Sequence, residues 1–306
     1  MEEILKVENL VKVYGEQRVV DEISFQVYKG EIFGLLGPNG AGKTTTMEMI
    51  EGLRKPDGGT ASINGYDIVK EKKKVKEVIG VQLQSTSLFE LLKVKEIMKV
   101  YASFYPSSLP IDAILGDVSL TEKEESFVKQ LSGGQKQRLA IALALVNDPS
   151  VIFLDEPTTG LDPQSRRALW DIILRLKKRG KTIFLSTHYM DEAQILCDRI
   201  AIMDRGKIIA LDTPNGLVNG LNMGTAIEFH RDAQIPLHTL EFIGGVRKAR
   251  EKEEWVTLYS DNLQSTLTDL VSLTSEQGIQ LIDLRTRTAT LEDVFLSMTG
   301  RRLREE

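Results

Sequence analysis

The sequence is poor in cysteine and has no long apolar run. Its 306 residues contain one cysteine, Cys197, which excludes an intrachain disulfide and a cysteine-rich zinc site. The longest uninterrupted apolar run, residues 139–146, is far shorter than the roughly 20 residues that a membrane-spanning helix needs. The acidic start MEEILKVENL contains neither a basic segment nor an apolar stretch, so we expect no secretion signal.

The chain also lacks an excess of positive charge. It carries 39 Lys and Arg against 44 Asp and Glu, a formal net charge of −5, with 42% hydrophobic residues. Because nucleic-acid binding favours basic patches, we expect no nucleic-acid partner. The composition is typical of a globular protein, and the length predicts about two domains.

Strand-like apolar runs alternate with helical patterns through about residue 210, which predicts an α/β domain with a largely parallel sheet. Short apolar runs at 31–36, 151–154 and 182–185 predict buried strands. A helix is predicted over 163–179, where apolar residues recur at helical spacing at Ala168, Leu169, Ile172, Ile173 and Leu176. From about residue 90 to 145 the pattern is helical, which predicts a helical insertion in the α/β core.

The pattern changes after residue 206. Residues 212–220 are rich in Asn, Gly and Pro, which predicts a linker. Beyond it we predict strand 225–230, helix 235–243, strands 246–250 and 255–260, helix 263–277, strand 279–285 and a final helix 290–299. This order is typical of a smaller α+β, ferredoxin-like domain. The predicted domains are therefore 1–215 and 216–306.

A phosphate-binding loop is predicted between the strand at 31–36 and a helix at 44–51. Residues 37–44 fit the pattern G-x-x-x-x-G-K-[ST]. Glycines let backbone N–H groups converge on phosphates, Lys43 brings a charge to the β- and γ-phosphates, and the Thr44 hydroxyl can ligate Mg²⁺. The predicted nucleotide-binding residues here are Gly37, Pro38, Asn39, Gly40, Ala41, Gly42, Lys43, Thr44 and Thr45.

Two acids and a histidine follow the other predicted strands. Asp155 suits Mg²⁺, because ligands of open α/β sheets bind outside the carboxyl ends of the strands. Glu156 could accept a proton from an attacking water. Alone, this pair could simply start a solvated loop, but the phosphate-binding loop in the same domain favours catalysis. His188 follows strand 182–185, and a solvent-facing histidine is its alternative interpretation.

The pentapeptide Leu131-Ser132-Gly133-Gly134-Gln135, together with these motifs, resembles the signature of the ATP-binding cassette (ABC) ATPases. The resemblance covers residues 1 to about 215 and implies a P-loop NTPase fold that hydrolyses ATP with Mg²⁺. In it, Glu156 is the general base, and the metal residues are Asp155, Thr44 and Gln84. Gln84 is preferred over Gln82 as the glutamine that ligates Mg²⁺ or orients water.

The resemblance implies further roles around the nucleotide. Tyr14 would stack on adenine, and His188 would hold the γ-phosphate and the water in line. The signature residues Ser132, Gly133, Gly134 and Gln135 would contact the ATP of a partner cassette, and Asp162 would lie in the D-loop. Two cassettes, most simply identical copies, would then close over two ATP molecules.

Segments 186–193, 196–200, 290–295 and 299–301 resemble the daunorubicin-resistance branch of drug exporters. This resemblance implies an ATPase subunit peripheral on the cytoplasmic face of the cell membrane. A separate ABC-2 type permease would dock near residues 84–94 and the helical insertion. The C-terminal domain would serve dimerisation, permease bracing or regulation. The alternative is a soluble ABC ATPase acting on ribosomes or nucleic acid. It is disfavoured because the chain has one cassette and too few residues between Lys43 and Leu131 for a long coiled-coil arm.

Overall fold

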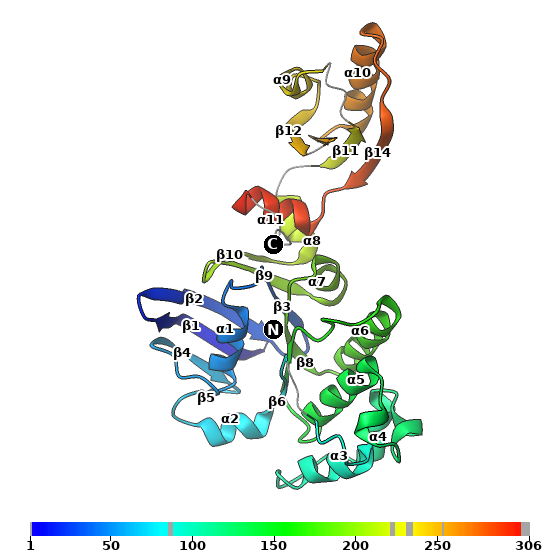
Figure 1. Ribbon diagram of the computed structural model, residues 1–306. Helices are drawn as coiled ribbons and strands as arrows, with labels where there is room; N and C mark the ends of the chain where they lie inside the picture. The colour runs from blue at the N-terminus through cyan, green and yellow to red at the C-terminus, as the bar shows by residue number, and fades with distance from the viewer. Residues whose placement is uncertain (1, 85–87, 221–223, 231–234, 253, 301–306) are drawn as a thin grey trace. The chain divides into compact units, whose positions relative to one another are not determined.

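The computed structural model describes residues 2–84, 88–220, 224–230, 235–252 and 254–300. The chain divides into two compact units, Met1–Thr213 and Pro214–Glu306. Each unit has its own sheet and its own core, and each is described by itself below (Figure 1).

The first unit contains two sheets. A mostly parallel six-stranded sheet has the order β10-β9-β3-β8-β7-β6, and only its β9–β10 pair is antiparallel. Its strands are β3 (Ile32–Leu36), β6 (Ile79–Gln82), β7 (Val151–Asp155), β8 (Thr182–Thr187), β9 (Arg199–Asp204) and β10 (Lys207–Asp212). The predicted α/β class is therefore confirmed.

A second, antiparallel sheet of the first unit was not predicted. Its order is β2-β1-β4-β5, with strands β1 (Glu3–Tyr14), β2 (Gln17–Tyr28), β4 (Gly58–Ile63) and β5 (Tyr66–Asp67). The two sheets share one core, in which Phe25 of β2 stacks on Phe33 of β3 at 5.1 Å between ring centroids. Phe184 of β8 packs against both rings. This apolar contact fixes β3 and β8, the strands that lead into the predicted site.

Helices cover the parallel sheet and form the predicted insertion. α1 (Lys43–Ile50), α2 (Lys72–Val78), α6 (Pro163–Lys178) and α7 (Met190–Leu196) connect strands. Between β6 and β7 lie α3 (Val94–Ala102), α4 (Ile111–Asp117) and α5 (Gly133–Ala144). In α6, four of the five predicted apolar positions are buried. The predicted helix is confirmed, and Ala168 is exposed because it lies beside that apolar stripe.

The second unit begins with a helix where we predicted a linker. α8 (Pro214–Gly220) carries a buried Leu217 and contacts α11 (Leu291–Thr299). Proline is well tolerated in the first turn of a helix, and one buried leucine anchors this short element. The turn residues were therefore wrongly interpreted as a linker.

The rest of the second unit has the predicted β-α-β-β-α-β order. Its elements are β11 (Thr225–His230), α9 (Leu237–Glu241), β12 (Val246–Lys252), β13 (Trp255–Ser260), α10 (Leu263–Glu276) and β14 (Ile282–Thr288). The sheet order β12-β13-β11-β14 is antiparallel throughout. Each βαβ unit is thus split by a strand of the other, which is the ferredoxin-like arrangement.

Candidate nucleotide site

The carboxyl ends of three neighbouring strands bring the predicted site residues together. In the parallel register, Leu36 of β3 lies beside Thr187 of β8, and Asp155 of β7 lies beside Ser186 of β8. The loop after β3, the acids after β7 and the histidine after β8 therefore meet at one sheet edge. Open α/β sheets bind their ligands at this edge.

The loop after β3 requires glycine at three positions. Gly40 and Gly42 have left-handed backbone angles, with φ of 76° and 102°. A Cβ at Gly37 would lie 2.3 Å from the carbonyl oxygen of Met203. The loop therefore passes close to β9 and turns directly into α1, whose N-terminal N–H groups face the loop.

Lys43 lies buried inside this loop. Its Nζ donates to the carbonyl oxygens of Gly37 at 2.8 Å and Pro38 at 3.1 Å, and it lies 3.5 Å from Glu156 Oε1. Burial lowers the pKa of Lys43, and the Glu156 carboxylate opposes that shift. Phosphate oxygens could replace the two carbonyls as acceptors for this amine.

Glu156 is the point on which the site converges. Its Oε2 accepts hydrogen bonds from Gln84 Nε2 and Thr159 Oγ1, both at 3.2 Å, and lies 3.3 Å from His188 Nδ1. The close His188 imidazole, aided by the charge of Lys43, lowers the pKa of Glu156 to about 2 against the effect of its burial. The other residues predicted to take part in hydrolysis, Gln84, His188 and Lys43, therefore all contact the Glu156 carboxylate.

The neighbouring Asp155 is held from a different side. Ser186 Oγ donates a hydrogen bond to Asp155 Oδ1. Burial raises the pKa of Asp155, and hydrogen bonds from the hydroxyls of Ser186 and Thr44 oppose that rise. We did not predict Ser186, although its place at the carboxyl end of a predicted strand could have indicated it.

The structure also distinguishes the two candidate glutamines. The Nε2 of Gln82 is turned towards backbone carbonyls, those of Leu83 at 2.6 Å and Asp155 at 3.4 Å. Gln84 instead reaches the Glu156 carboxylate. Of the two, Gln84 is the one placed to contact a ligand at the site.

Part of this site forms a cavity of about 300 Å³, whose lining does not include the predicted residues Gly37, Pro38, Ala41, Asp155 and His188. Its lining consists of Val19, Asn39, Gly40, Gly42, Lys43, Thr44, Thr45, Gln84 and Glu156. Val19 was not predicted, because it is an apolar residue of the antiparallel sheet that we did not predict, and no sequence motif marks it as a binding residue. Tyr14, the signature residues and Asp162 do not line it.

The predicted residues outside the cavity have other contacts. The Tyr14 ring is 41% exposed at the end of β1, with Lys12 Nζ at 5.5 Å and Arg54 at 5.4 Å from its centroid. Asp162 caps α6, accepting from the backbone N–H groups of Gln164 and Ser165 at 3.0 Å.

The signature forms the start of α5. Ser132 Oγ accepts from the backbone of Gln135 at 3.3 Å, and the Gln135 side chain accepts from the Ser132 backbone at 2.9 Å. Ser132 and Gly133 are exposed. A Cβ at Gly134 would lie 2.8 Å from Ser165 Oγ of α6, so glycine allows the two helices to approach here.

Comparison with known proteins decides the family. The profile of the ABC transporter family matches residues 20–159. The chain is 38% identical to the Nod factor export ATP-binding protein I of Ralstonia nicotianae, over 99% of this chain and 95% of that protein. The chain belongs to the ABC transporter family. It is 35% identical to the linearmycin resistance ATP-binding protein LnrL of Bacillus subtilis, over 99% of this chain and all of that protein.

A solved structure shares the cassette. A bacterial ABC transporter cassette, solved as a dimer, matches with a TM-score of 0.62 and 27% identity, over 69% of this chain and 98% of its own. This ABC subunit therefore binds and hydrolyses ATP, as predicted. No helix among the described residues combines the length and apolar character needed to span a bilayer.

Proposed function

We propose that this ABC subunit drives an exporter of drug-like cargo through a separate ABC-2 type permease. The match to the export and resistance subunits carries this proposal, because it extends over both units and not only over the cassette. Closure of two cassettes on ATP would supply the motion, and hydrolysis would reset it.

For hydrolysis we assign Glu156 as the base. The water's proton passes to Glu156 as the water oxygen bonds to the γ-phosphorus and the bond to the ADP oxygen breaks. Gln84, Thr159 and His188 orient the carboxylate that receives this proton. The Lys43 charge, 3.5 Å away, stabilises the anionic form of Glu156. When Lys43 pairs with a bound phosphate, it stabilises the Glu156 anion less. The pKa of Glu156 then rises, and the carboxylate becomes a stronger base.

The residues at the sheet edge fit Mg²⁺. Asp155, Thr44 and Gln84 offer a carboxylate, a hydroxyl and an amide oxygen, the hard donors that Mg²⁺ takes together with phosphate oxygens. Since Gln84 Nε2 donates to Glu156, its carbonyl oxygen is the atom available for a metal. Bound there, the ion would neutralise charge on the β- and γ-phosphates.

We propose that the second cassette is an identical copy. The exposed Ser132 and Gly133 lie at the start of a helix but outside the lining of the phosphate cavity. A helix start with exposed N–H groups suits an anion. Ser132, Gly133, Gly134 and Asp162 of one copy would therefore meet the ATP of the other, with Gln135 acting through Ser132. The related cassette that was solved as a dimer supports the pairing of two copies.

We propose that the adenine base of ATP stacks on the exposed ring of Tyr14. Stacking of a base on an aromatic side chain contributes about 1–3 kcal/mol. The nearby Lys12 and Arg54 add positive charge beside the ring.

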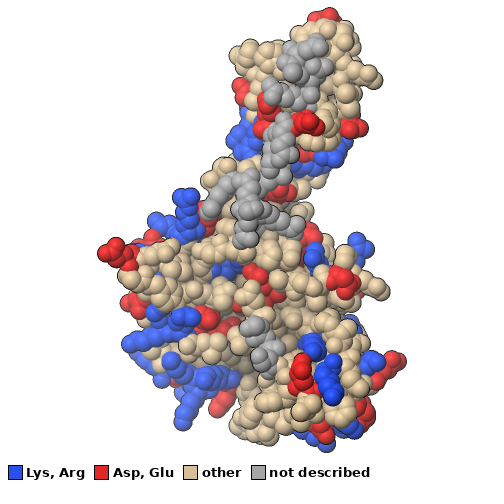
Figure 2. Space-filling view, viewed as in Figure 1, with Lys and Arg blue, Asp and Glu red and all other residues tan. Residues whose placement is uncertain are grey.

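Permease docking is proposed at the junction of β6 with the helical insertion. Leu83, Phe89 and Leu91 are 42%, 59% and 75% exposed. A further cavity of about 300 Å³, lined in part by Leu83 and Leu143, lies beside them. Figure 2 shows charged side chains of both signs on one face of the first unit, with uncharged surface between them. Exposed apolar residues of this size suit an interaction surface, and docking there would place the chain on the cytoplasmic face of the membrane.

Co-purification from native membranes tests the proposal. A tagged chain should recover a multi-span permease, identified by mass spectrometry. Leu91→Asp should abolish the recovery, whereas Ile195→Asp, which changes an exposed residue of α7, should not. Recovery of ribosomal proteins instead, or no difference between the two variants, would contradict the proposal. For the second unit, the role in dimerisation or permease bracing stays a prediction.

A further inference from the structure

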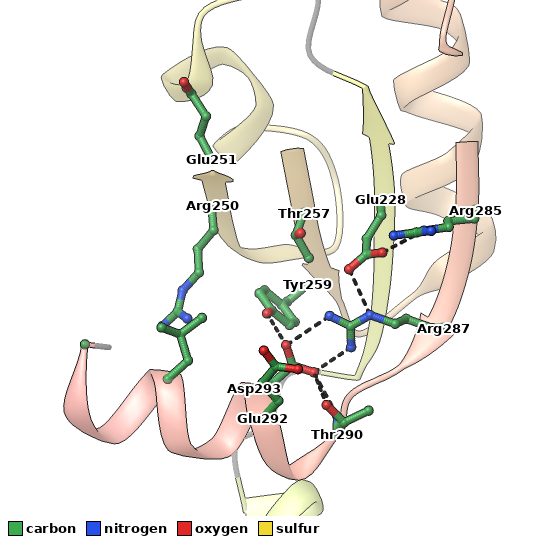
Figure 3. A pocket seen from close by; sticks show the side chains of 12 residues that line it. Glu228, Arg250, Glu251, Thr257, Tyr259, Arg285, Arg287, Thr290, Glu292 and Asp293 are labelled. Atoms are coloured by element: carbon green, nitrogen blue, oxygen red, sulfur yellow. Dashed lines mark hydrogen bonds and ion pairs between the residues drawn. The ribbon is translucent and has the colours of Figure 1, made fainter. Parts of the chain in front are cut away.

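One face of the sheet in the second unit is not covered by α9 and α10. Those helices pack on the apolar face, against residues such as Ile227, Phe229 and Leu258. Because side chains alternate along a strand, their neighbours point to the opposite face. A cavity of about 920 Å³ lies there, bounded by the strands and by α11 (Figure 3).

The strand register arranges polar residues in rows across this open face. One row runs from Arg250 on β12 through Thr257 on β13 and Glu228 on β11 to Arg285 on β14. The neighbouring row starts at Lys248, opposite Tyr259, and ends at Arg287. Each row therefore begins and ends with a cation.

The cations at the β14 end are neutralised. Glu228 accepts from Arg285 Nε and Arg287 Nε, both at 2.8 Å. Asp293 of α11 accepts from Arg287 Nη1 and from the Tyr259 hydroxyl, both at 2.6 Å. Figure 3 shows these groups converging beside α11.

The cations at the β12 end have no such partners. Among the described residues, no acidic group pairs with Arg250 or Lys248, and Arg250 Nη1 is buried without a hydrogen-bond partner. Burial, and then the charge of Arg250, lowers the pKa of Lys248. A buried guanidinium nitrogen is costly unless it is paired, and no described carboxylate pairs with it at this end of the cavity.

We propose that this cavity binds a small organic anion, whose carboxylate or phosphate pairs with Arg250. The hydroxyl of Thr257, directly across from Arg250, adds a hydrogen-bond donor, and Leu296 of α11 adds an apolar contact for the body of the ligand. Glu251 and Glu292 also line the cavity. In Figure 3, Glu251 points away from the Arg250 guanidinium. Its carboxylate therefore leaves the guanidinium available, and the proposed anion binds at Arg250 and does not extend along the acidic part of the lining.

Binding to the full chain tests this proposal. The chain is first saturated with ADP, which fills the nucleotide cavity, and is then titrated with phenyl phosphate, benzoate and inorganic phosphate by calorimetry. Saturable binding of phenyl phosphate or benzoate is expected, and the probe that binds more tightly identifies the preferred group. Weaker binding of inorganic phosphate would show that the apolar contact contributes.

Two variants with the same charge change locate the site. Arg250→Gln should weaken binding about tenfold or more, and it should fold because Arg250 Nη1 is unpartnered and no hydrogen bond joins the side chain to another described residue. Arg247→Gln is the matched control, since Arg247 of the same strand pairs with Asp261 and does not line the cavity. No saturable binding of any probe would overturn the proposal. Equal losses in the two variants would do the same, because they would show a response to net charge alone.

Discussion

Replacing Glu156 by glutamine tests its role as proton acceptor separately from ATP binding by the phosphate-binding loop. The substitution keeps the size of the side chain and removes its charge, while the contacts of Lys43 to Gly37 and Pro38 remain. We expect hydrolysis to fall by roughly 10²- to 10⁴-fold, the usual contribution of a general base. ATP affinity should stay the same or rise, because the amide no longer competes with phosphate for Lys43.

The structure also indicates how much Glu156→Gln should lower the free energy of unfolding. The pKa of Glu156 falls from 4.5 to about 2 on folding. At 1.36 kcal/mol per unit, this favours the folded state by up to about 3 kcal/mol at neutral pH. It is an upper bound, since burial of Lys43 acts against it. A carboxyl whose pKa is lowered stabilises the fold above its unfolded pKa. The stability difference between wild type and variant should therefore shrink as the pH falls from 4.5 towards 2.

Three measurements on the same preparations test this prediction. Phosphate release gives turnover, equilibrium binding of a fluorescent ATP analogue gives affinity, and size-exclusion chromatography with ATP detects a trapped dimer. Glu71→Gln, which alters an exposed ion pair on α2, is the matched control and should behave as wild type. Turnover of the Glu156 variant within a few-fold of the control would refute the assignment of the base.

Other predictions concern binding and pH. Lys43→Ala should weaken ATP binding itself by at least about 1.5 kcal/mol, since a charge-assisted contact to phosphate is lost. Unchanged ATP affinity in a binding titration would contradict the role of Lys43 in binding the phosphates. Tyr14→Ala should weaken ATP binding by about 1–3 kcal/mol with little effect on turnover at saturation; an equal loss for inorganic triphosphate would argue against stacking. The Glu51 carboxyl is buried with no hydrogen-bond partner among the described residues, and burial raises its pKa to about 8. Wild type should therefore lose stability as the pH rises from 4.5 to 8, and Glu51→Gln should be more stable at pH 8 by up to about 5 kcal/mol in urea unfolding.

The fold was largely predictable where short motifs and apolar runs coincide. β7 and β8 are wholly buried strands of the parallel sheet, and the short, almost wholly apolar runs at 151–154 and 182–185 predicted this. The antiparallel sheet was missed because β1 and β2 are interrupted by polar residues and by register shifts. β14 begins later than predicted, at Ile282, and residue 283 has a left-handed backbone.

Polar packing was less predictable than strand placement. Glu192 of α7 is fully buried and accepts a hydrogen bond from the indole of Trp170 on α6 at 3.0 Å. Nothing in the sequence distinguishes it from the exposed Asp191 beside it. Its burial depends on how α6 and α7 pack, which is a contact between residues distant in sequence.

The sequence alone determined the chemistry of this protein, because the phosphate loop, the signature and the acids after a buried strand are local patterns with local physical causes. It determined the ATPase class and the two-domain plan. Only the tertiary structure decided that Gln84 and not Gln82 faces Glu156, that Lys43 and His188 contact the same carboxylate, and that Arg250 has no acidic partner among the described residues. These facts depend on strand order and register, which bring together side chains distant in sequence, such as Lys43 and Glu156.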